Sequence, residues 1–168
     1  MPTKHLPHVN LHTPRLVLEV LNVEHAETMV EALFSPEIYR FIDDTPPTLD
    51  FLNWRYRKQS DNWEGRPVSW HNWIITAKKT GDAMGYVQAT INHSRRTAEL
   101  GWVVAPKYAG QGFASEAARR VIAEINGWKA LRILCTIDSR NIASQHLARA
   151  LGFTLVEPAP QQAQRWEL

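Results

Sequence analysis

The residues with the clearest chemical potential form a glycine-rich turn, Lys-Tyr-Ala-Gly-Gln-Gly, at 107–112. An apolar strand pattern at 99–104 precedes it and ends at Pro106, because proline has no amide hydrogen for a strand ladder. After Gly112, apolar residues recur at the spacing of one helix face. These residues are Ala114, Ala117, Ala118, Val121, Ile122 and Ile125. We expect Gly127 to end this helix in a left-handed conformation. A turn that leads directly into a helix presents free amides at the positive end of the helix dipole, which favours a phosphate or pyrophosphate.

Three phosphate-binding motifs compete for this turn. A Walker loop is excluded because it ends in Gly-Lys-Ser or Gly-Lys-Thr, whereas Gly112 is followed by Phe-Ala-Ser. The dinucleotide fingerprint GxGxxG fits in part, with Ser115 in the third glycine's place and Asp138 near the place of the ribose-binding acid. However, residues 105–109 separate the first glycine from its strand, and too few strands follow for a doubly wound sheet. A nicotinamide-dinucleotide protein is therefore the weaker alternative.

The third motif depends on a second segment, 141–153, which follows a strand pattern at 131–138. This segment opens with Asn141, carries an apolar helix face and ends at Gly152. The residues of that face are Ala143, Leu147, Ala150 and Leu151. Together the two segments resemble the GCN5-related N-acetyltransferase (GNAT) superfamily. The phosphate loop of that superfamily reads Gln/Arg-x-x-Gly-x-Gly/Ala, and Lys107 stands here in the first place. Its later helix typically opens with Asn and closes with Leu-Gly-Phe, as 141–153 do.

The resemblance implies an α/β (α+β) fold, with a GNAT-like mixed, mostly antiparallel, splayed sheet flanked by helices. We expect a single acetyltransferase domain over 1–168, with 1–12 as a flexible arm. Further strand patterns lie at 15–21, 70–77, 83–91, 153–157 and 165–168, and helical patterns lie after Asn22, after Ser35 and at 48–61. The face of the helix after Asn22 comprises Ala26, Met29, Val30, Leu33 and Phe34. The opening Thr-Pro-Arg-Leu-Val-Leu at 13–18 resembles the branch that contains the ribosomal-protein N-terminal acetyltransferases (RimJ/RimL-like).

Composition argues against several other classes of protein. The chain carries 19 Lys and Arg against 17 Asp and Glu, and a net charge of +2 provides no general field for nucleic acid or membrane. No apolar run is long enough to span a bilayer, and the amino terminus lacks the apolar stretch of a secretory signal. A single cysteine excludes an internal disulfide and favours a cytoplasmic location. We expect Cys135 to be a buried thiol, because it alternates with Ile133 and Ile137. The histidines at 5, 8 and 12 lack carboxylate or cysteine support, so no metal site is predicted. Both a monomer and a homodimer are compatible with the sequence.

The resemblance implies acetyl-CoA as co-substrate and assigns the residues that bind it. Backbone groups of the strand before the turn would pair with the pantetheine arm, and one of their amides would polarise the thioester carbonyl. Amides of the turn and of the helix start would hold the pyrophosphate. The implied cofactor-binding residues are Trp102, Val103, Val104, Lys107, Gly110, Gln111, Gly112, Phe113, Ala114, Asn141 and Ser144.

The resemblance also implies the catalytic groups. Several family members use a glutamate on the strand before the turn as general base, and Glu99 lies on that strand. A base is needed because the attacking amine must be neutral, whereas a free alkylamine is mostly protonated at pH 7. The family's usual tyrosine acid is replaced by Ala148, which leaves Ser144 as the substitute candidate. A thiolate can also leave without an acid, because thiols are more acidic than alcohols.

The expected activity is N-acetyl transfer from acetyl-CoA to a primary amine by direct attack in a ternary complex. The amine could belong to a protein N-terminus or to a small molecule. Three carboxylates, Asp43, Asp44 and Asp50, lie in the region that lines the family's acceptor pocket and could attract a cationic amine. One or two of the tryptophans at 54, 63, 70 and 73 could form a wall of that pocket. Because Ala148 replaces the tyrosine, a non-catalytic acyl-CoA-binding or sensory module is the alternative.

Overall fold

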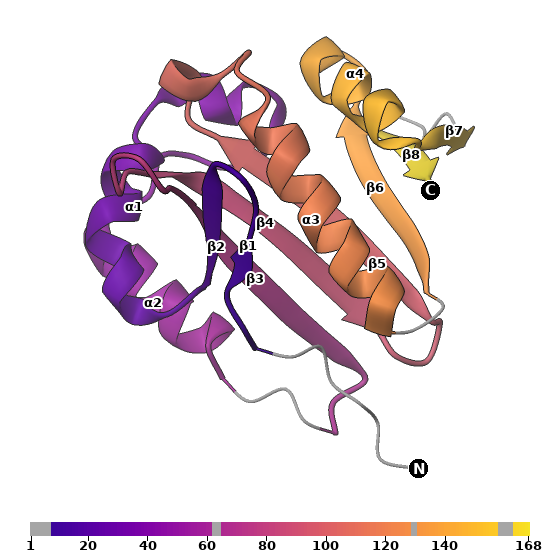
Figure 1. Cartoon of the computed structure of the whole chain (residues 1–168), viewed down its shortest axis with the longest axis horizontal. Helices are drawn as coiled ribbons and strands as arrows, with labels where there is room; N and C mark the ends of the chain where they lie inside the picture. The colour runs from indigo at the N-terminus through magenta and orange to yellow at the C-terminus, as the bar shows by residue number, and fades with distance from the viewer. Residues whose placement is uncertain (1–7, 62–64, 129–130, 158–162) are drawn as a thin grey trace.

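One open sheet of eight strands forms the centre of the computed structural model, which describes residues 8–61, 65–128, 131–157 and 163–168. The strand order is β1-β2-β3-β4-β5-β6-β8-β7, and all neighbours are antiparallel except β5 and β6 (Figure 1). The strands are β1 (Leu11–His12), β2 (Leu16–Val20), β3 (Val68–Ala77), β4 (Ala83–Asn92), β5 (Thr97–Val104), β6 (Arg132–Asp138), β7 (Thr154–Glu157) and β8 (Ala163–Glu167). The predicted α/β fold with a mixed, mostly antiparallel sheet is confirmed.

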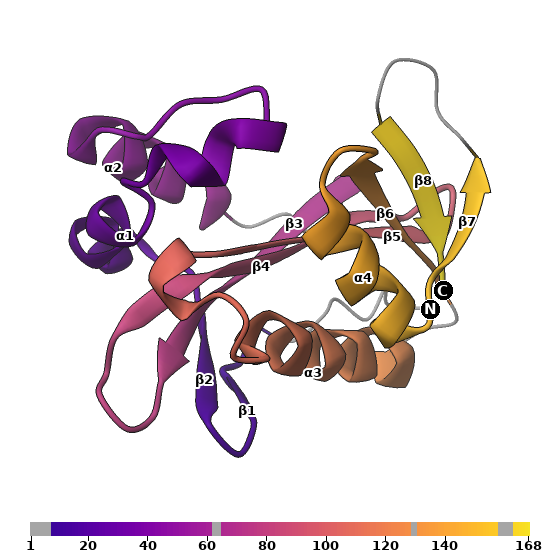
Figure 2. The same cartoon turned by 90° about the horizontal axis from the view of Figure 1, so that it is seen from above.

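Helices cover both faces of this sheet (Figure 2). On one face lie α3 (Phe113–Trp128) and, beside it, α4 (Ile142–Leu151). On the other face lie α1 (Ala26–Ala32) and α2 (Leu49–Gln59). Among the described residues, three short 3-10 helices complete the connections: η1 (Val23–His25), η2 (Pro36–Phe41) and η3 (Pro106–Tyr108).

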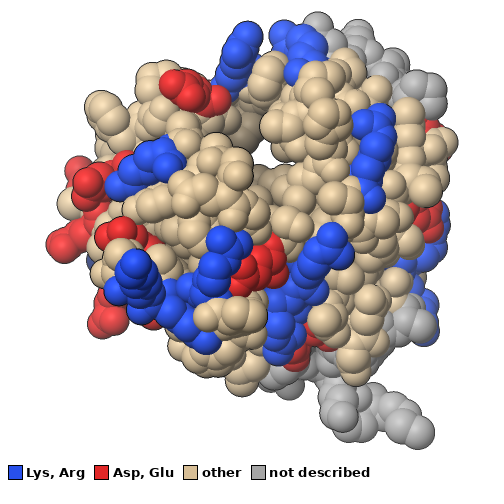
Figure 3. Space-filling model, turned by 45° about the horizontal axis from the view of Figure 1, so that its top comes forward, with Lys and Arg blue, Asp and Glu red and all other residues tan. Residues whose placement is uncertain are grey.

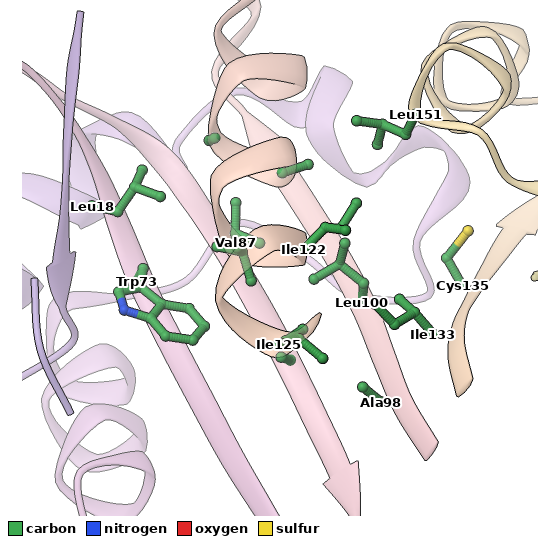
Figure 4. Close-up of a cluster of buried hydrophobic side chains, with 14 of the residues drawn as sticks. Leu18, Trp73, Val87, Ala98, Leu100, Ile122, Ile125, Ile133, Cys135 and Leu151 are labelled. Atoms are coloured by element: carbon green, nitrogen blue, oxygen red, sulfur yellow. The ribbon is translucent and has the colours of Figure 1, made fainter. Parts of the chain in front are cut away.

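The side chains of the central strands β3, β4 and β5 alternate between two hydrophobic cores, one on each face. On the first face Val87 and Leu100 of the sheet meet Ile122 and Ile125 of α3 (Figure 4). The face predicted for the helix after the glycine turn is buried from Ala117 onward. The second core lies under α1 and α2, where Ile74 of β3 packs with residues of both helices.

The sheet opens between β5 and β6. The two strands pair only where Thr97, Ala98 and Glu99 face Arg132, Ile133 and Leu134. Beyond Glu99 they diverge (Figure 1), so residues 100–104 have no ladder partner on this side within the described part of the chain. The predicted splay is confirmed, and it leaves backbone groups of β5 free for another partner.

Three local predictions at element ends were wrong. Gly127 lies inside α3 instead of ending it in a left-handed conformation, because glycine also accepts right-handed helical angles. Phe34 is 72% exposed, because α1 ends at Ala32 before the predicted apolar face reaches it. Leu11 and His12 form the short strand β1 within the expected arm, and Leu11 is buried. The first seven residues of that arm lie outside the described residues.

The apolar face of α4 also differs from the predicted one. The buried residues are Gln145, Ala148 and Leu151, whereas Ala143 and Ala150 are exposed. The helix therefore meets the core along a line of residues spaced three apart. Both predicted ends of α4 are confirmed: the Asn141 side chain accepts a hydrogen bond from the Ser144 amide, and Gly152 is left-handed with φ +99°.

Candidate active site

A groove of about 540 Å³ lies between the glycine turn and the start of α4, over the free end of β5. The turn and the first residues of α3 form one wall, and α4 forms the other. The predicted cofactor-binding residues that line the groove are Trp102, Val103, Val104, Gly110, Gly112, Phe113, Ala114, Asn141 and Ser144. Ala143 and Leu147, which the sequence pattern assigned to the core face of α4, line it as well. In the space-filling view an opening passes between uncharged side chains near the top of the molecule (Figure 3).

The glycine turn has the backbone geometry of an anion-binding loop. Gly110 and Gly112 both adopt left-handed angles, with φ of +73° and +80°. The chain enters α3 at Phe113, directly after the second glycine. The first amides of a helix have no partner within it, and here residues 112–115 line the groove. The turn can therefore offer backbone donors and a helix dipole to a phosphate.

Two predicted side chains of the turn lie elsewhere. Neither Lys107 nor Gln111 lines the groove. The Gln111 Nε2 atom donates to the backbone carbonyl of Lys107 at 3.3 Å, and the Lys107 ammonium lies 4.9 Å from the Tyr108 ring centre. Their side chains stabilise the turn, so any contact they make with a ligand in the groove has to come from the backbone.

The Arg15 side chain binds the glycine turn, and the sequence analysis did not predict this role. Its guanidinium donates to the Gln111 carbonyl oxygen at 3.0 Å and to Glu116 at 2.6 Å, and it lies 4.3 Å from the Phe113 ring centre. Thr13 donates to the other oxygen of Glu116 at 2.6 Å. Burial alone would raise the pKa of Glu116, but these bonds outweigh it and lower the pKa below its usual value. The Thr-Pro-Arg pattern at 13–15 was the available sequence signal. In the structure its Thr13 and Arg15 side chains bind Glu116, and Arg15 also binds the Gln111 carbonyl.

A second hollow, of about 270 Å³, opens on the other side of the splay. Its walls include Gly101 of β5, Thr136 and Asp138 of β6, and Gln88 of β4. It shares six lining residues with the groove: Phe41, Ile42, Trp102, Val103, Asn141 and Ser144. The two hollows thus meet at the end of β5, and ligands bound in them would approach each other there.

Ser144 and Glu99 have different relations to this meeting point. Ser144 lines both hollows at the first turn of α4. Glu99 lines neither, and its exposed carboxylate accepts a hydrogen bond from the Thr136 hydroxyl at 3.0 Å. Thr136 itself lines the second hollow. Glu99 is therefore separated from the hollow by one hydroxyl group. Asp138 does line it, but the Arg140 guanidinium bonds this carboxylate at 2.9 Å and lowers its pKa.

Only some of the acidic and aromatic residues that were expected to line an acceptor pocket line one of the hollows. Asp44 lines a third hollow, deeper under η2 and α2, whereas Asp43 and Asp50 do not. Trp73 is buried in the main core, and Trp54 and Trp70 are exposed without lining any of the three hollows. Trp63 lies outside the described residues. Tyrosines take the expected place of the tryptophans: Tyr86 lines both the second and the third hollow.

The described residues show no group of three metal-ligating side chains, and no helix among them is long and apolar enough to cross a membrane. The His8 ring lies against that of His71, with ring centres 5.3 Å apart and the two planes tilted by 32°. The histidine at 12 lies on β1, and the one at 5 falls outside the described residues.

Cys135 is buried, as predicted, and should be inert. Burial, with a contribution from the nearby Glu99 carboxylate, raises its pKa to about 12. At pH 8 the thiolate fraction is then about 10⁻⁴, and the thiolate is the reactive form. We expect no reaction with a thiol-specific disulfide reagent in the folded protein, and one reactive thiol per chain in 6 M guanidinium (about the concentration that unfolds even hyperstable domains). Reaction of the folded protein at the rate of a free thiol would contradict this burial.

Fold and site together define an α/β protein with a glycine turn and a groove at a split sheet. A family model described as "Acetyltransferase (GNAT) domain" matches residues 15–154. The chain belongs to this family of acetyltransferases. Among curated proteins, the Bacillus licheniformis "Uncharacterized N-acetyltransferase p20" is 28% identical over 147 residues, which cover 85% of this chain and 81% of that protein.

Two solved structures show how widely this fold is shared. The ribosomal L7/L12 alpha-N-protein acetyltransferase RimL in complex with coenzyme A has a TM-score of 0.84 at 13% identity, covering 95% of this chain and 97% of that chain. A chimera of the spermidine N-acetyltransferase SpeG from Vibrio cholerae has a TM-score of 0.74 at 19% identity, covering 91% and 94%. The names of these two proteins specify a ribosomal protein and spermidine as acceptors, so the shared fold leaves the acceptor of this chain open.

Proposed function

We propose that this protein transfers an acetyl group from acetyl-CoA to a primary amine by direct attack in a ternary complex. The observation that carries the proposal is the meeting of two hollows at the splay, one beside the glycine turn and one lined by β4, β5 and β6. Two substrates held in them would be brought together at the free end of β5, which replaces a bimolecular encounter by a positioned one. The sole cysteine supports a cytoplasmic location, and the 13–18 pattern supports the RimJ/RimL-like branch.

The residues of the groove fit acetyl-CoA. A Cβ atom added at Gly110 would project into open space beside the turn, so the glycine leaves room for a ligand to approach the backbone. Gly110, Gly112, Phe113 and Ala114 would hold the pyrophosphate through their amides. The free backbone of 102–104, with Asn141 at the start of α4, would hold the pantetheine arm. When bound, acetyl-CoA supplies an activated thioester carbonyl.

The protein's own groups would then serve three steps. Glu99 would take the proton of the ammonium, through water and beside the Thr136 hydroxyl that it already binds. A backbone amide near Val103 would stabilise the oxygen that gains charge as the nitrogen–carbon bond forms. As the carbon–sulfur bond breaks, the Ser144 hydroxyl would pass a proton to the thiolate and regain one from the nitrogen, which loses its second proton as the amide forms; Ser144 lines both hollows at their junction. No acyl-enzyme is needed, and the buried Cys135 thiol is unsuited to form one.

A Glu99→Gln variant tests the proposed base. We expect kcat/KM to fall by about 10²–10⁴-fold and the acidic limb of the pH-rate profile to move, because glutamine cannot accept the proton. Acetyl-CoA affinity should stay at the wild-type value. Thr136→Val is the matched control, since it removes the hydroxyl bound to Glu99 but keeps the carboxylate, and it should cost much less. A variant with the wild-type pH profile would remove Glu99 from the mechanism.

The second candidate is a non-catalytic acyl-CoA-binding or sensory module. It is favoured by Ala148, which is fully buried in the core, so the place of the family's tyrosine acid presents no acid to the groove. Calorimetric titration with acetyl-CoA and with desulfo-CoA tests cofactor binding, and thiol release across an amine and peptide panel tests transfer. Binding with release supports the enzyme, and binding without release with any amine supports the module. Absence of binding to either ligand would overturn both.

A further inference from the structure

The third hollow continues the second one under η2 and α2. Ile42, Arg55, Tyr86 and Gln88 line both hollows, so the two hollows adjoin along these four residues. Aliphatic side chains and tyrosine rings form most of its wall. Its volume of about 40 Å³ exceeds the roughly 10–15 Å³ that one water molecule needs, so the hollow has room for a compact group only.

One polar group in this hollow is unsatisfied. Asn72 is 7% exposed, lines the third hollow, and its Nδ2 atom has no hydrogen-bond partner among the described residues. A buried amide donor without a partner is costly, and it points to an oxygen that is supplied from outside the protein. In the sheet, Asn72 lies opposite Gln88, which in turn lies opposite Gly101. The donor is therefore two strand spacings, about 10 Å, from the splay.

The charges of the hollow balance. The Arg55 guanidinium lies 3.8 Å from the Asp44 carboxylate, and both residues line the hollow. Burial, with contributions from Tyr86 and Asp44, raises the pKa of Tyr39 to about 12, so this phenol stays neutral. Because the Asp44 carboxylate already pairs with Arg55, it adds little binding energy for a second cation such as an ammonium group. A polycation thus finds no free negative charge in this hollow, whereas an uncharged end group needs none.

We propose that the acceptor is a small monoamine whose body crosses the second hollow and whose compact, uncharged end places a hydrogen-bond-accepting oxygen against Asn72 Nδ2. This inference deepens the proposed function and rests on it. Gly101 makes the crossing possible, because a side chain there would stand in open space between the splay and Gln88. The sequence signal was weak, because Asn72 is one of three buried polar residues of β3, with Ser69 and His71, and the sequence does not show which of them faces a pocket.

A matched pair of probe amines tests the proposal without knowledge of the natural acceptor. The probes 3-(4-methoxyphenyl)propylamine and 3-(4-ethylphenyl)propylamine differ only in an oxygen that replaces a methylene group, about 10 Å from the amine. They are titrated into the protein saturated with desulfo-CoA, so the readout is ternary binding and does not require catalysis. We expect the methoxy compound to bind about 10–100-fold more tightly in the wild type, because the ethyl compound leaves the Asn72 donor buried and unpaired.

Two variants assign the effect. In Asn72→Leu the preference for the methoxy compound should vanish, while the melting temperature stays equal or rises, because the variant removes an unsatisfied donor. In Gly101→Val both probes should bind at least about tenfold more weakly, with acetyl-CoA binding retained. Equal binding of the two probes to the wild type, or no binding of either, would overturn the inference, and this comparison needs no variant to fold.

The failures of the inference and of the proposed function are distinguishable. If thiol release occurs with spermidine or with a serine-terminal peptide but not with the methoxy amine, the acetyltransferase assignment stands and the monoamine inference is overturned. If desulfo-CoA does not bind at all, the proposed function fails, and the inference fails with it.

Discussion

A Gly112→Val variant is expected to bind acetyl-CoA about 100-fold more weakly than the wild type. Gly112 has φ +80°, and a β-branched residue in this left-handed region costs about 1–3 kcal/mol. A Cβ atom there would also lie 3.4 Å from the Arg15 guanidinium, which holds the turn through the Gln111 carbonyl. The contact with Arg15 has an ordinary van der Waals length, but the turn can relieve the backbone strain at residue 112 only by moving, and residues 112–115 of the groove wall move with it. Each 1.4 kcal/mol needed to restore the binding geometry is a tenfold loss of affinity.

Calorimetric titration with acetyl-CoA measures this loss, and Gly127→Ala is the matched control. Gly127 lies in the same helix with open space around its Cβ position and no left-handed angle. The control should bind acetyl-CoA normally and gain up to about 1 kcal/mol of stability, because alanine is the better helix former. If Gly112→Val retained wild-type affinity, the glycine turn would not be the anion site.

A Gly85→Ala variant is expected to lose about 3 kcal/mol of unfolding free energy, the upper end for overpacking in a closely packed site. A Cβ atom at Gly85 would overlap the carbonyl oxygen of Val103, which is backbone and cannot swing aside as a side chain can. Gly85 has φ +156° and lies where the register between β3 and β4 shifts, so the close approach belongs to a bulge. The neighbouring β5 backbone would be displaced, and acetyl-CoA affinity should fall as well.

Urea unfolding measures the free energy, with Gly101→Ala as control. Gly101 lies on the adjacent strand β5 and a Cβ atom there meets open space, so the control should unfold within about 0.5 kcal/mol of the wild type, a typical range for a substitution at an accessible site. Unchanged stability of Gly85→Ala would mean that β4 and β5 do not approach as closely as the structure has them.

Local sequence patterns were enough to predict the elements that surround the candidate site. The glycine turn, the buried face of α3, the Asn141 cap and the left-handed Gly152 each depend on neighbours within a few residues along the chain, so spacing alone predicts them. The same local reasoning failed at Gly127, because glycine allows a helix to end and also to continue, and the sequence does not choose between them.

Contacts between distant segments decided the rest. Arg15 reaches the turn at Gln111 and Glu116, about a hundred residues on, and no local pattern contains such a pairing. Ala143 and Leu147 have the character of core residues, but the packing of α4 beside the splay turns them toward the groove. Asn72 becomes a candidate binding residue only because η2 and α2 fold over β3 and β4 and enclose it. Hydrophobic spacing and helix propensity depend on residues close together in the sequence, so they can be predicted from it. A cavity is the space left between distant segments, so it exists only once those segments have packed.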